Sequence, residues 1–141
     1  MNSHEVVAQI KALSLAFGQY ILVGGGVLAI HHIRETKDID IVVVPALFEQ
    51  LAMTWPLDQE YERKWQRKRL KKGEVEIYPD LYLEKQSLFI NVAILIKQAD
   101  MVEDLPLQPL EHLMMCKLDS AREKDLQDVE LIKKYLERVA A

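Results

Sequence analysis

Three consecutive glycines, Gly24 to Gly26, separate an apolar tetrapeptide from an apolar segment of helical character. The tetrapeptide YILV at 20–23 predicts a short buried strand, and VLAIHHI at 27–33 predicts a short helix after the glycine turn. Glycine accepts positive φ and lets the backbone approach a ligand closely. A strand–turn–helix unit of this kind is therefore suited to hold phosphate oxygens on backbone amides.

Two aspartates, Asp38 and Asp40, stand at the start of a second predicted strand, DIDIVVV at 38–44. Because side chains alternate along a strand, both carboxylates point to the same face. Neighbouring carboxylates repel each other unless a cation neutralises them, and oxygen ligands favour a hard ion such as Mg²⁺ or Mn²⁺. The plainer interpretation is a pair of solvated acids at a strand edge.

A dinucleotide-binding turn is an alternative, since Gly24-x-Gly26-x-x-Ala29 fits the pattern GxGxxG/A. That pattern needs an acidic residue at the C-terminal end of the second strand. Here the strand ends in VVVP at 42–45, and the acids stand at its beginning. The position of the acids favours a metal site over a dinucleotide site.

The remaining elements indicate an α/β or α+β protein, in which helices and strands alternate first and helices come last. A hairpin is expected between 61–70 and 74–78, and residues 81–99 are ambiguous, with helix favoured from about Ser87. The length of 141 residues predicts a single domain over 1–141, with a core at about 1–100 and C-terminal helices at about 108–140. Further helices are predicted at 4–16, 46–53, 110–121 and 124–139.

The charge distribution is uneven, although the formal net charge is only −4. The segment RKWQRKRLKK at 63–72 holds seven of the 18 basic residues. Such a run is usually a solvated face, and the competing interpretation is an RNA-binding patch with Trp65 as a stacking surface.

The single cysteine, Cys116, excludes an internal disulfide and a cysteine-based zinc site, and it is expected to be a buried thiol on a helix. No apolar run approaches the roughly 18–20 residues of a membrane span, so a cytoplasmic location is expected.

The segment VGGGVLAIHHIRETKDIDIVVV resembles the signature of the DNA polymerase beta-like nucleotidyltransferase superfamily. The form GG…R-x-T-x-D-I-D-I is typical of its small bacterial members, which include minimal nucleotidyltransferases, aminoglycoside nucleotidyltransferases and the nucleotidyltransferase toxins of type IV toxin–antitoxin pairs. A second, helical match has the form K-L-x-x-x-R-x-K-D-x-x-D. The matching positions are Gly24, Gly25, Arg34, Thr36, Asp38 and Asp40 in the first segment, and Lys117, Leu118, Arg122, Lys124, Asp125 and Asp128 in the second.

The resemblance implies a nucleotidyltransferase fold, with a short mixed β-sheet flanked by helices and a C-terminal helical pair. It also implies transfer of a nucleoside monophosphate from an NTP to an acceptor hydroxyl on RNA, protein or a small molecule, with release of pyrophosphate. Asp38 and Asp40 would hold two Mg²⁺ or Mn²⁺ ions, one that binds the triphosphate and a second that, with a further carboxylate, activates the acceptor hydroxyl. The family's third carboxylate, which acts as a metal ligand and base, is assigned to Glu76, with Glu74 and Asp80 as alternatives.

The nucleotide would contact the glycine turn at Gly24 and Gly25 together with Arg34, Thr36 and Lys117. Each side chain also has a plainer interpretation: Arg34 would pair with Glu35 or Asp38, Thr36 would close the turn before the strand, and the charged residues 122–128 would lie on a helix surface. The competing function is a catalytically inactive nucleotide- or nucleic-acid-binding module of the same fold. A homodimer or an antitoxin partner is expected as the protein partner.

Overall fold

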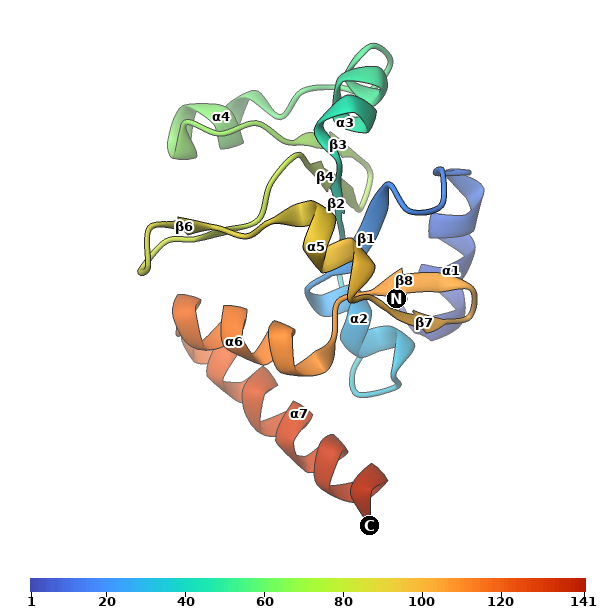
Figure 1. Ribbon diagram of the computed structural model, residues 1–141, viewed down its shortest axis with the longest axis vertical. Helices are drawn as coiled ribbons and strands as arrows, with labels where there is room; N and C mark the ends of the chain where they lie inside the picture. Colours follow the sequence, from blue (N-terminus) through green and yellow to red (C-terminus); the bar gives the residue numbers. More distant parts are fainter.

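A six-stranded mixed sheet forms the centre of the computed structural model, which describes residues 1–141 (Figure 1). β1 pairs antiparallel with β2, whereas the pairs β2–β4 and β1–β8 are parallel. The register sets Asp40 between Val23 on β1 and Glu76 on β4. In spatial order the strands are β3 (Leu70–Lys72), β4 (Val75–Tyr78), β2 (Ile39–Val43), β1 (Tyr20–Val23), β8 (Leu105–Leu107) and β7 (Asp100–Val102).

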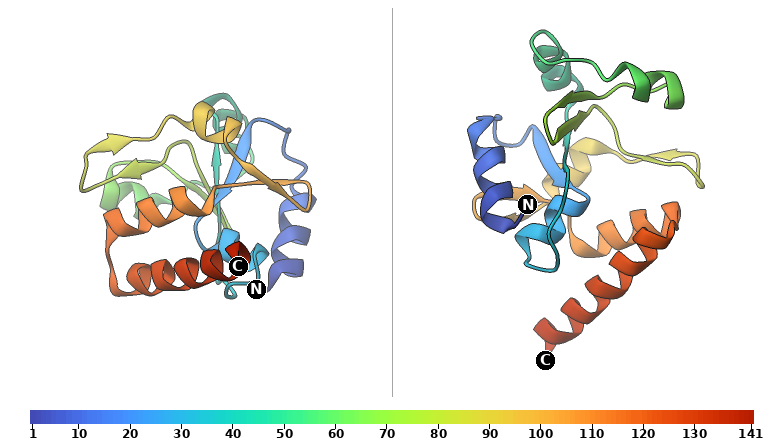
Figure 2. Two further views of the ribbon diagram at one scale, coloured as in Figure 1. Left: turned by 60° about the horizontal axis from the view of Figure 1, so that its bottom comes forward. Right: turned by 180° about the vertical axis from the view of Figure 1, so that it is seen from behind.

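Helices cover both faces of this sheet. The main core lies on the face packed by α1, α2 and α3, and a smaller cluster joins Val23 and Val42 to Leu95 of α5 on the other face. α6 and α7 contact each other and run side by side as a pair at one end of the molecule (Figure 2). The helices are α1 (Ser3–Ala12), α2 (Gly25–Ile30), α3 (Pro45–Ala52), α4 (Gln59–Trp65), α5 (Val92–Lys97), α6 (Leu110–Ser120) and α7 (Glu123–Ala140).

Local sequence explains where several helices begin and end. Asn2 and Glu5 form a capping box at the start of α1, and Pro45 occupies the first turn of α3, where its missing N–H costs nothing. The Asp58 side chain accepts a hydrogen bond from the backbone N–H of Tyr61 and so caps α4. These signals fix the first residues of α1, α3 and α4.

The mixed α/β class is confirmed, and the predicted strands at 20–23 and 38–44 are present with small changes at their ends. The first helix is shorter than expected: it ends at Ala12, because Ser14 adopts a φ of 51°. None of the helices combines the length and the apolar character that crossing a membrane requires.

The prediction for 61–70 was wrong in its first half. The segment begins as α4, which Asp58 caps, and only Leu70–Lys72 forms the hairpin strand that pairs with Val75–Tyr78 around Gly73. The basic run is therefore divided between a helix, a loop and a strand.

The helix favoured from Ser87 was also wrong over its first residues. Ser87 has a φ of 48°, and a small hairpin of β5 (Tyr82–Leu83) and β6 (Leu88–Phe89) precedes α5. The antiparallel pair of β7 and β8 was not predicted, and Pro106 lies inside β8 opposite Met101.

Candidate functional site

A cleft of about 1210 Å³ opens beside the glycine turn and is lined by parts of β2, α4, β4, α6 and the start of α7. Its lining includes ten Lys and Arg residues but only eight Asp and Glu residues. The cleft is therefore richer in positive charge than the chain as a whole, whose formal net charge is −4. Such a lining suits an anionic ligand.

The glycine turn borders this cleft and requires glycine for two reasons. Gly24 has a φ of +69° and a ψ of −146°, a conformation that side-chain-bearing residues rarely adopt. A Cβ on Gly24 would also lie 3.1 Å from Oδ2 of Asp40. The neighbouring Gly25 is equally confined, because a Cβ there would lie 2.6 Å from Oγ1 of Thr36.

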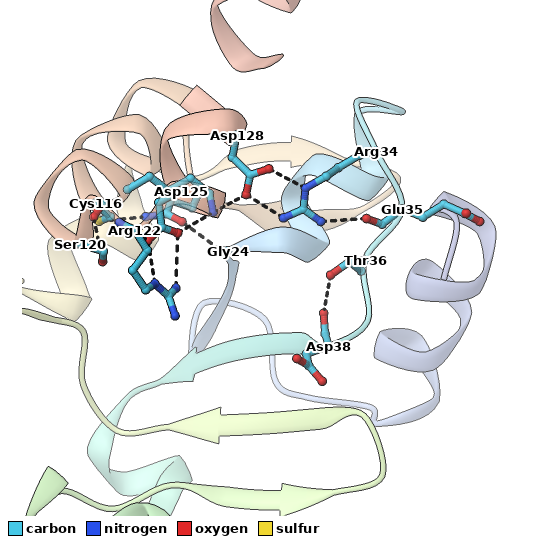
Figure 3. A network of polar contacts seen from close by, with 12 residues as sticks. Gly24, Arg34, Glu35, Thr36, Asp38, Cys116, Ser120, Arg122, Asp125 and Asp128 are labelled. Atoms are coloured by element: carbon cyan, nitrogen blue, oxygen red, sulfur yellow. Dashed lines mark hydrogen bonds and ion pairs between the residues drawn. The ribbon is translucent and has the colours of Figure 1, made fainter. Parts of the chain in front are cut away.

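Of the two predicted aspartates, Asp38 lies directly before β2 and Asp40 is its second residue, and both line the cleft. Neither Asp38 nor Asp40 forms an ion pair, although Oδ1 of Asp40 lies 3.4 Å from the Tyr78 hydroxyl. Thr36 donates a hydrogen bond to the backbone oxygen of Asp38 at 2.9 Å, and the Asp38 carboxylate points away from it (Figure 3). Burial, followed by the adjacent carboxylates of Glu76 and Asp38, raises the pKa of Asp40 to about 8.

Glu76 is the acid that lies beside Asp40, directly across the parallel β2–β4 register. Of the alternatives, Glu74 is exposed and Asp80 lies 3.9 Å from Arg67. The Glu76 carboxylate is already bound: Oε2 accepts hydrogen bonds of 2.8 Å from Arg69 and 2.8 Å from Tyr78.

Arg69 and Tyr78 were not predicted as site residues. The Arg69 guanidinium joins Glu76 to Asp58, with Nε 2.8 Å from Oδ2 of Asp58, and it stacks 4.3 Å from the Tyr61 ring. Burial tends to lower the pKa of Arg69, but Tyr78, Asp58 and Glu76 outweigh it and raise the pKa above its usual value. Burial, with the charges of Asp40 and Glu76, raises the pKa of Tyr78, so that hydroxyl keeps its proton.

The fit of these acids to a divalent ion differs from one to the next. No group of three His, Cys, Asp or Glu side chains is gathered closely enough to hold a metal ion as it stands. The carboxylates of Asp38 and Asp40 face the cleft, and neither forms an ion pair with a basic side chain. Oxygen donors of this kind suit Mg²⁺ or Mn²⁺. Glu76 does not fit as a further ligand in this arrangement, because Arg69 and Tyr78 hold its carboxylate.

A second polar network ties the glycine side of the cleft to the C-terminal helices (Figure 3). Arg34 donates through Nε and Nη2 to the two carboxylate oxygens of Asp128, at 2.7 and 2.8 Å. Lys117 of α6 lies 2.7 Å from Asp128 and 3.6 Å from Asp125, and Arg122 lies 2.8 Å from Asp125. Arg34 and Lys117, which were predicted to bind nucleotide, thus line the cleft while paired with α7.

Two of the plainer interpretations of these residues were wrong. Arg34 pairs with Asp128 and donates to the backbone oxygen of Glu35, rather than pairing with the carboxylate of Glu35 or Asp38. Asp125 and Asp128 are buried rather than on the helix surface. Burial alone would raise the pKa of each, but the hydrogen bonds and charges of their basic partners outweigh it and hold both pKa values below the usual range.

The basic segment 63–72 is not simply a solvated face. Arg67 and Arg69 are each only 19% exposed and line the cleft, as does Trp65. Alternation along β4, which puts Glu76 and Tyr78 on one face, is the sequence signal that could have identified Tyr78. For Arg69 the sequence offered no comparable signal, because it stands among six other basic residues.

Cys116 also lines the cleft and is half-buried on α6. Burial raises the pKa of its thiol to about 11, so the group is neutral near pH 7. It therefore contributes to the wall of the cleft rather than acting as a nucleophile.

The cleft thus brings together the glycine turn, the carboxylates of Asp38 and Asp40, and the paired guanidinium groups of Arg34 and Arg69. No protein-family model matches the chain, and the search of curated proteins also found no match.

Proposed function

We propose that the protein is a Mg²⁺-dependent nucleotidyltransferase, which transfers a nucleoside monophosphate from an NTP to an acceptor hydroxyl and releases pyrophosphate. The observation that carries the proposal is the contact between the glycine turn and the metal-binding acids. Gly24 lies so close to Asp40 that a single methyl group would fill the gap, and both face a cleft lined by an excess of basic residues. Phosphate groups and a divalent ion need these two features side by side.

Each part of the cleft has a role in this proposal. Asp38 and Asp40 hold Mg²⁺ or Mn²⁺, which when bound neutralises charge on the polyphosphate. The backbone at Gly24 and Gly25 leaves room for phosphate oxygens, because no side chain projects from it. Lys117, fixed by Asp128, adds positive charge on the same side.

Further residues complete the proposed site. Thr36 fixes the backbone just before Asp38 through its hydrogen bond of 2.9 Å, and Arg34 is oriented by its double contact with Asp128. Glu76 lies across the register from Asp40, at the place expected for the third acid, but Arg69 and Tyr78 hold its carboxylate, so it has no role as a metal ligand in this proposal. The acceptor class favoured by the basic wall is RNA, with Trp65 and Arg67 facing the cleft.

The test is label transfer from radioactive NTPs in the presence of Mg²⁺ and candidate acceptors: cell extract, transfer RNA and aminoglycosides. The wild-type chain should label an acceptor, and Asp38→Ala combined with Asp40→Ala should abolish labelling, because the ion would lose both ligands. Glu130→Ala removes an exposed acid from α7 and is the matched control, with labelling unchanged. Labelling that survives in the double variant would contradict the proposed chemistry.

A second candidate is a binding module that holds Mg-NTP without transferring it. The specific observation in its favour is that Glu76 is not free, since Arg69 and Tyr78 bind it. Titration calorimetry with each Mg-NTP distinguishes the two candidates. Binding that depends on Asp40, with no transfer to any acceptor, would favour the module.

A further inference from the structure

Asp40 and Glu76 form a pair of neighbouring carboxylates with little access to water. They lie opposite each other on parallel strands, and Glu76 is only 7% exposed. Two carboxylates in such a setting are stable only if one of them keeps its proton or positive charge lies close by. In a site built on several carboxylates, that charge is usually supplied by metal ions.

Here the chain supplies a cation of its own. Nη1 of Arg69 lies 2.8 Å from Oε2 of Glu76 and 3.0 Å from the Tyr78 hydroxyl. The other Glu76 oxygen, Oε1, lies 3.7 Å from Nζ of Lys71. Both oxygens of this carboxylate therefore face cationic side chains, whereas Asp38 and Asp40 have no such partner.

Arg69 is also fixed from behind. Asp58 binds its Nε at 2.8 Å, and the Tyr61 ring lies 4.3 Å from the guanidinium. The backbone reinforces this arrangement, because the N–H of Asp58 donates to the carbonyl of Arg69 at 2.9 Å. These contacts hold the Arg69 guanidinium in a fixed position within the site, unlike a mobile charge on the surface.

We propose that Arg69 takes the place of a second metal ion: it is the resident cation of Glu76, and divalent-ion binding is confined to Asp38 and Asp40. The inference rests on the proposed function, because it specifies the metal content of that same site. Arg69 and Glu76 are then positioning residues, which keep a fixed positive charge beside the ion. An arginine charge is retained at any ordinary pH, so this half of the site stays charged without an ion.

The test is the stoichiometry of Mn²⁺ binding to the full chain without nucleotide, measured from the electron paramagnetic resonance signal of free Mn²⁺. The wild-type chain should bind about one ion, and Glu76→Gln should leave that value unchanged, because Glu76 is not a ligand. Asp40→Asn should remove the ion. Arg69→Met should remove the closest cation from Glu76, leaving the Tyr78 hydroxyl and the more distant Lys71, and raise the stoichiometry to about two, as in a two-metal site.

Two control variants separate this effect from general loss of charge. Arg67→Met removes a cleft arginine with the same 19% exposure and a similar tyrosine contact, 4.8 Å from the Tyr82 ring, but with no contact to Glu76. Arg67→Met should still bind about one Mn²⁺ ion per chain. Arg69→Lys should also bind about one, because it keeps a cation beside Glu76.

The outcomes distinguish this inference from the proposed function. Two ions on the wild-type chain, falling to one in Glu76→Gln, would overturn the role of Arg69 and leave the nucleotidyltransferase proposal in place. No Mn²⁺ on the wild-type chain would overturn both. The comparison of wild type with Glu76→Gln decides the question even if Arg69→Met fails to fold.

Discussion

Gly24 and Gly73 both have positive φ, +69° and +60°, but their surroundings differ. A Cβ on Gly73 would meet nothing within 4 Å, whereas one on Gly24 would lie 3.1 Å from Oδ2 of Asp40. We expect Gly73→Ala to cost about 1 kcal/mol of unfolding free energy, from backbone strain alone. Gly24→Ala should cost about 2–3 kcal/mol, since its conformation is more restricted to glycine and Asp40 must move.

Urea denaturation of the two alanine variants measures these costs. Equal losses of stability would mean that Asp40 moves away freely and that the close contact at Gly24 carries no weight. Gly24→Ala should also lower Mn²⁺ affinity at Asp40, and Gly73→Ala should not.

Asp40 is expected to give the protein an unusual dependence of stability on pH when divalent ions are absent. Its pKa rises from 3.8 in the unfolded chain to about 8 in the folded protein. Between these values the folded state keeps a proton that the unfolded state has released. The contribution of Asp40 to stability is therefore complete below pH 3.8 and is lost as the pH rises toward about 8.

Asp40→Asn isolates this effect, because asparagine does not titrate. With a chelator present, wild-type stability should fall relative to Asp40→Asn between about pH 4 and 8, by less than about 1.4 kcal/mol per pH unit. The buried Asp125 and Asp128 have lowered pKa values, so their contributions to stability change with pH mainly below pH 4, outside this range. Parallel stability curves for the two proteins, obtained by urea denaturation across this range, would contradict the raised pKa.

At the scale of the elements, one buried acid of α7 binds two cations on the glycine side of the cleft and in α6. Asp128 is 2% exposed and binds both Arg34 and Lys117. Asp128→Ala removes both oxygens that bind the Arg34 guanidinium and leaves Lys117 only its 3.6 Å contact with Asp125, and we expect a loss of about 3 kcal/mol of unfolding free energy. Glu130→Ala is the control on the same helix: its pair with Lys133 is more than half exposed, and its loss should be below about 0.5 kcal/mol.

Thermal or urea denaturation at neutral pH separates the two variants. Losses of equal size would show that the Arg34–Asp128 contact contributes no more than a surface ion pair. Circular dichroism at low urea should show whether α7 separates before the sheet unfolds.

The elements that the sequence predicts well are those with strong local signals. YILV, DIDIVVV and the C-terminal helices have clear apolar periodicity, and Pro45 and Gly73 mark a helix start and a turn. The failures lie where local signals are weak or where pairing partners are distant. α4 depends on the Asp58 cap, and β8 depends on its pairing with β1, Leu22 opposite Leu107, which no local pattern reveals.

The residues of the candidate site also fall into two groups, those with a local sequence signal and those that depend on contacts between segments. Spacing along one strand predicts that Asp38 and Asp40 share a face. Alternation does not separate Glu76 from Glu74, and the preference for Glu76 came from the family resemblance. Arg69 could not be found from spacing, because its contacts come from two other segments that meet it only in the folded chain: the start of α4, with Asp58 and the ring of Tyr61, and β4, with Glu76. Ion pairs between distant segments carry no sequence periodicity.

At the scale of the whole molecule, charge is separated between the cleft and the remaining surface. Ten basic and eight acidic residues line the cleft, although the chain as a whole has 18 basic and 22 acidic residues. The cleft should therefore attract polyphosphate even though the protein is acidic overall. This attraction should weaken as salt is added, because partly exposed charges are screened.

Two double variants test whether the local charge or the total charge governs this attraction. Lys64→Gln with Arg67→Gln removes two cations from the cleft, and Lys133→Gln with Lys134→Gln removes two exposed cations from α7 that lie outside it. Both changes shift the formal net charge of −4 by two negative units. The cleft variant should bind inorganic triphosphate, with Mg²⁺ present, roughly 3- to 10-fold more weakly and with less dependence on salt, whereas the α7 variant should bind like wild type. Calorimetric titrations at low and high salt measure both effects, and equal weakening in the two variants would mean that total charge, rather than the lining of the cleft, sets the affinity.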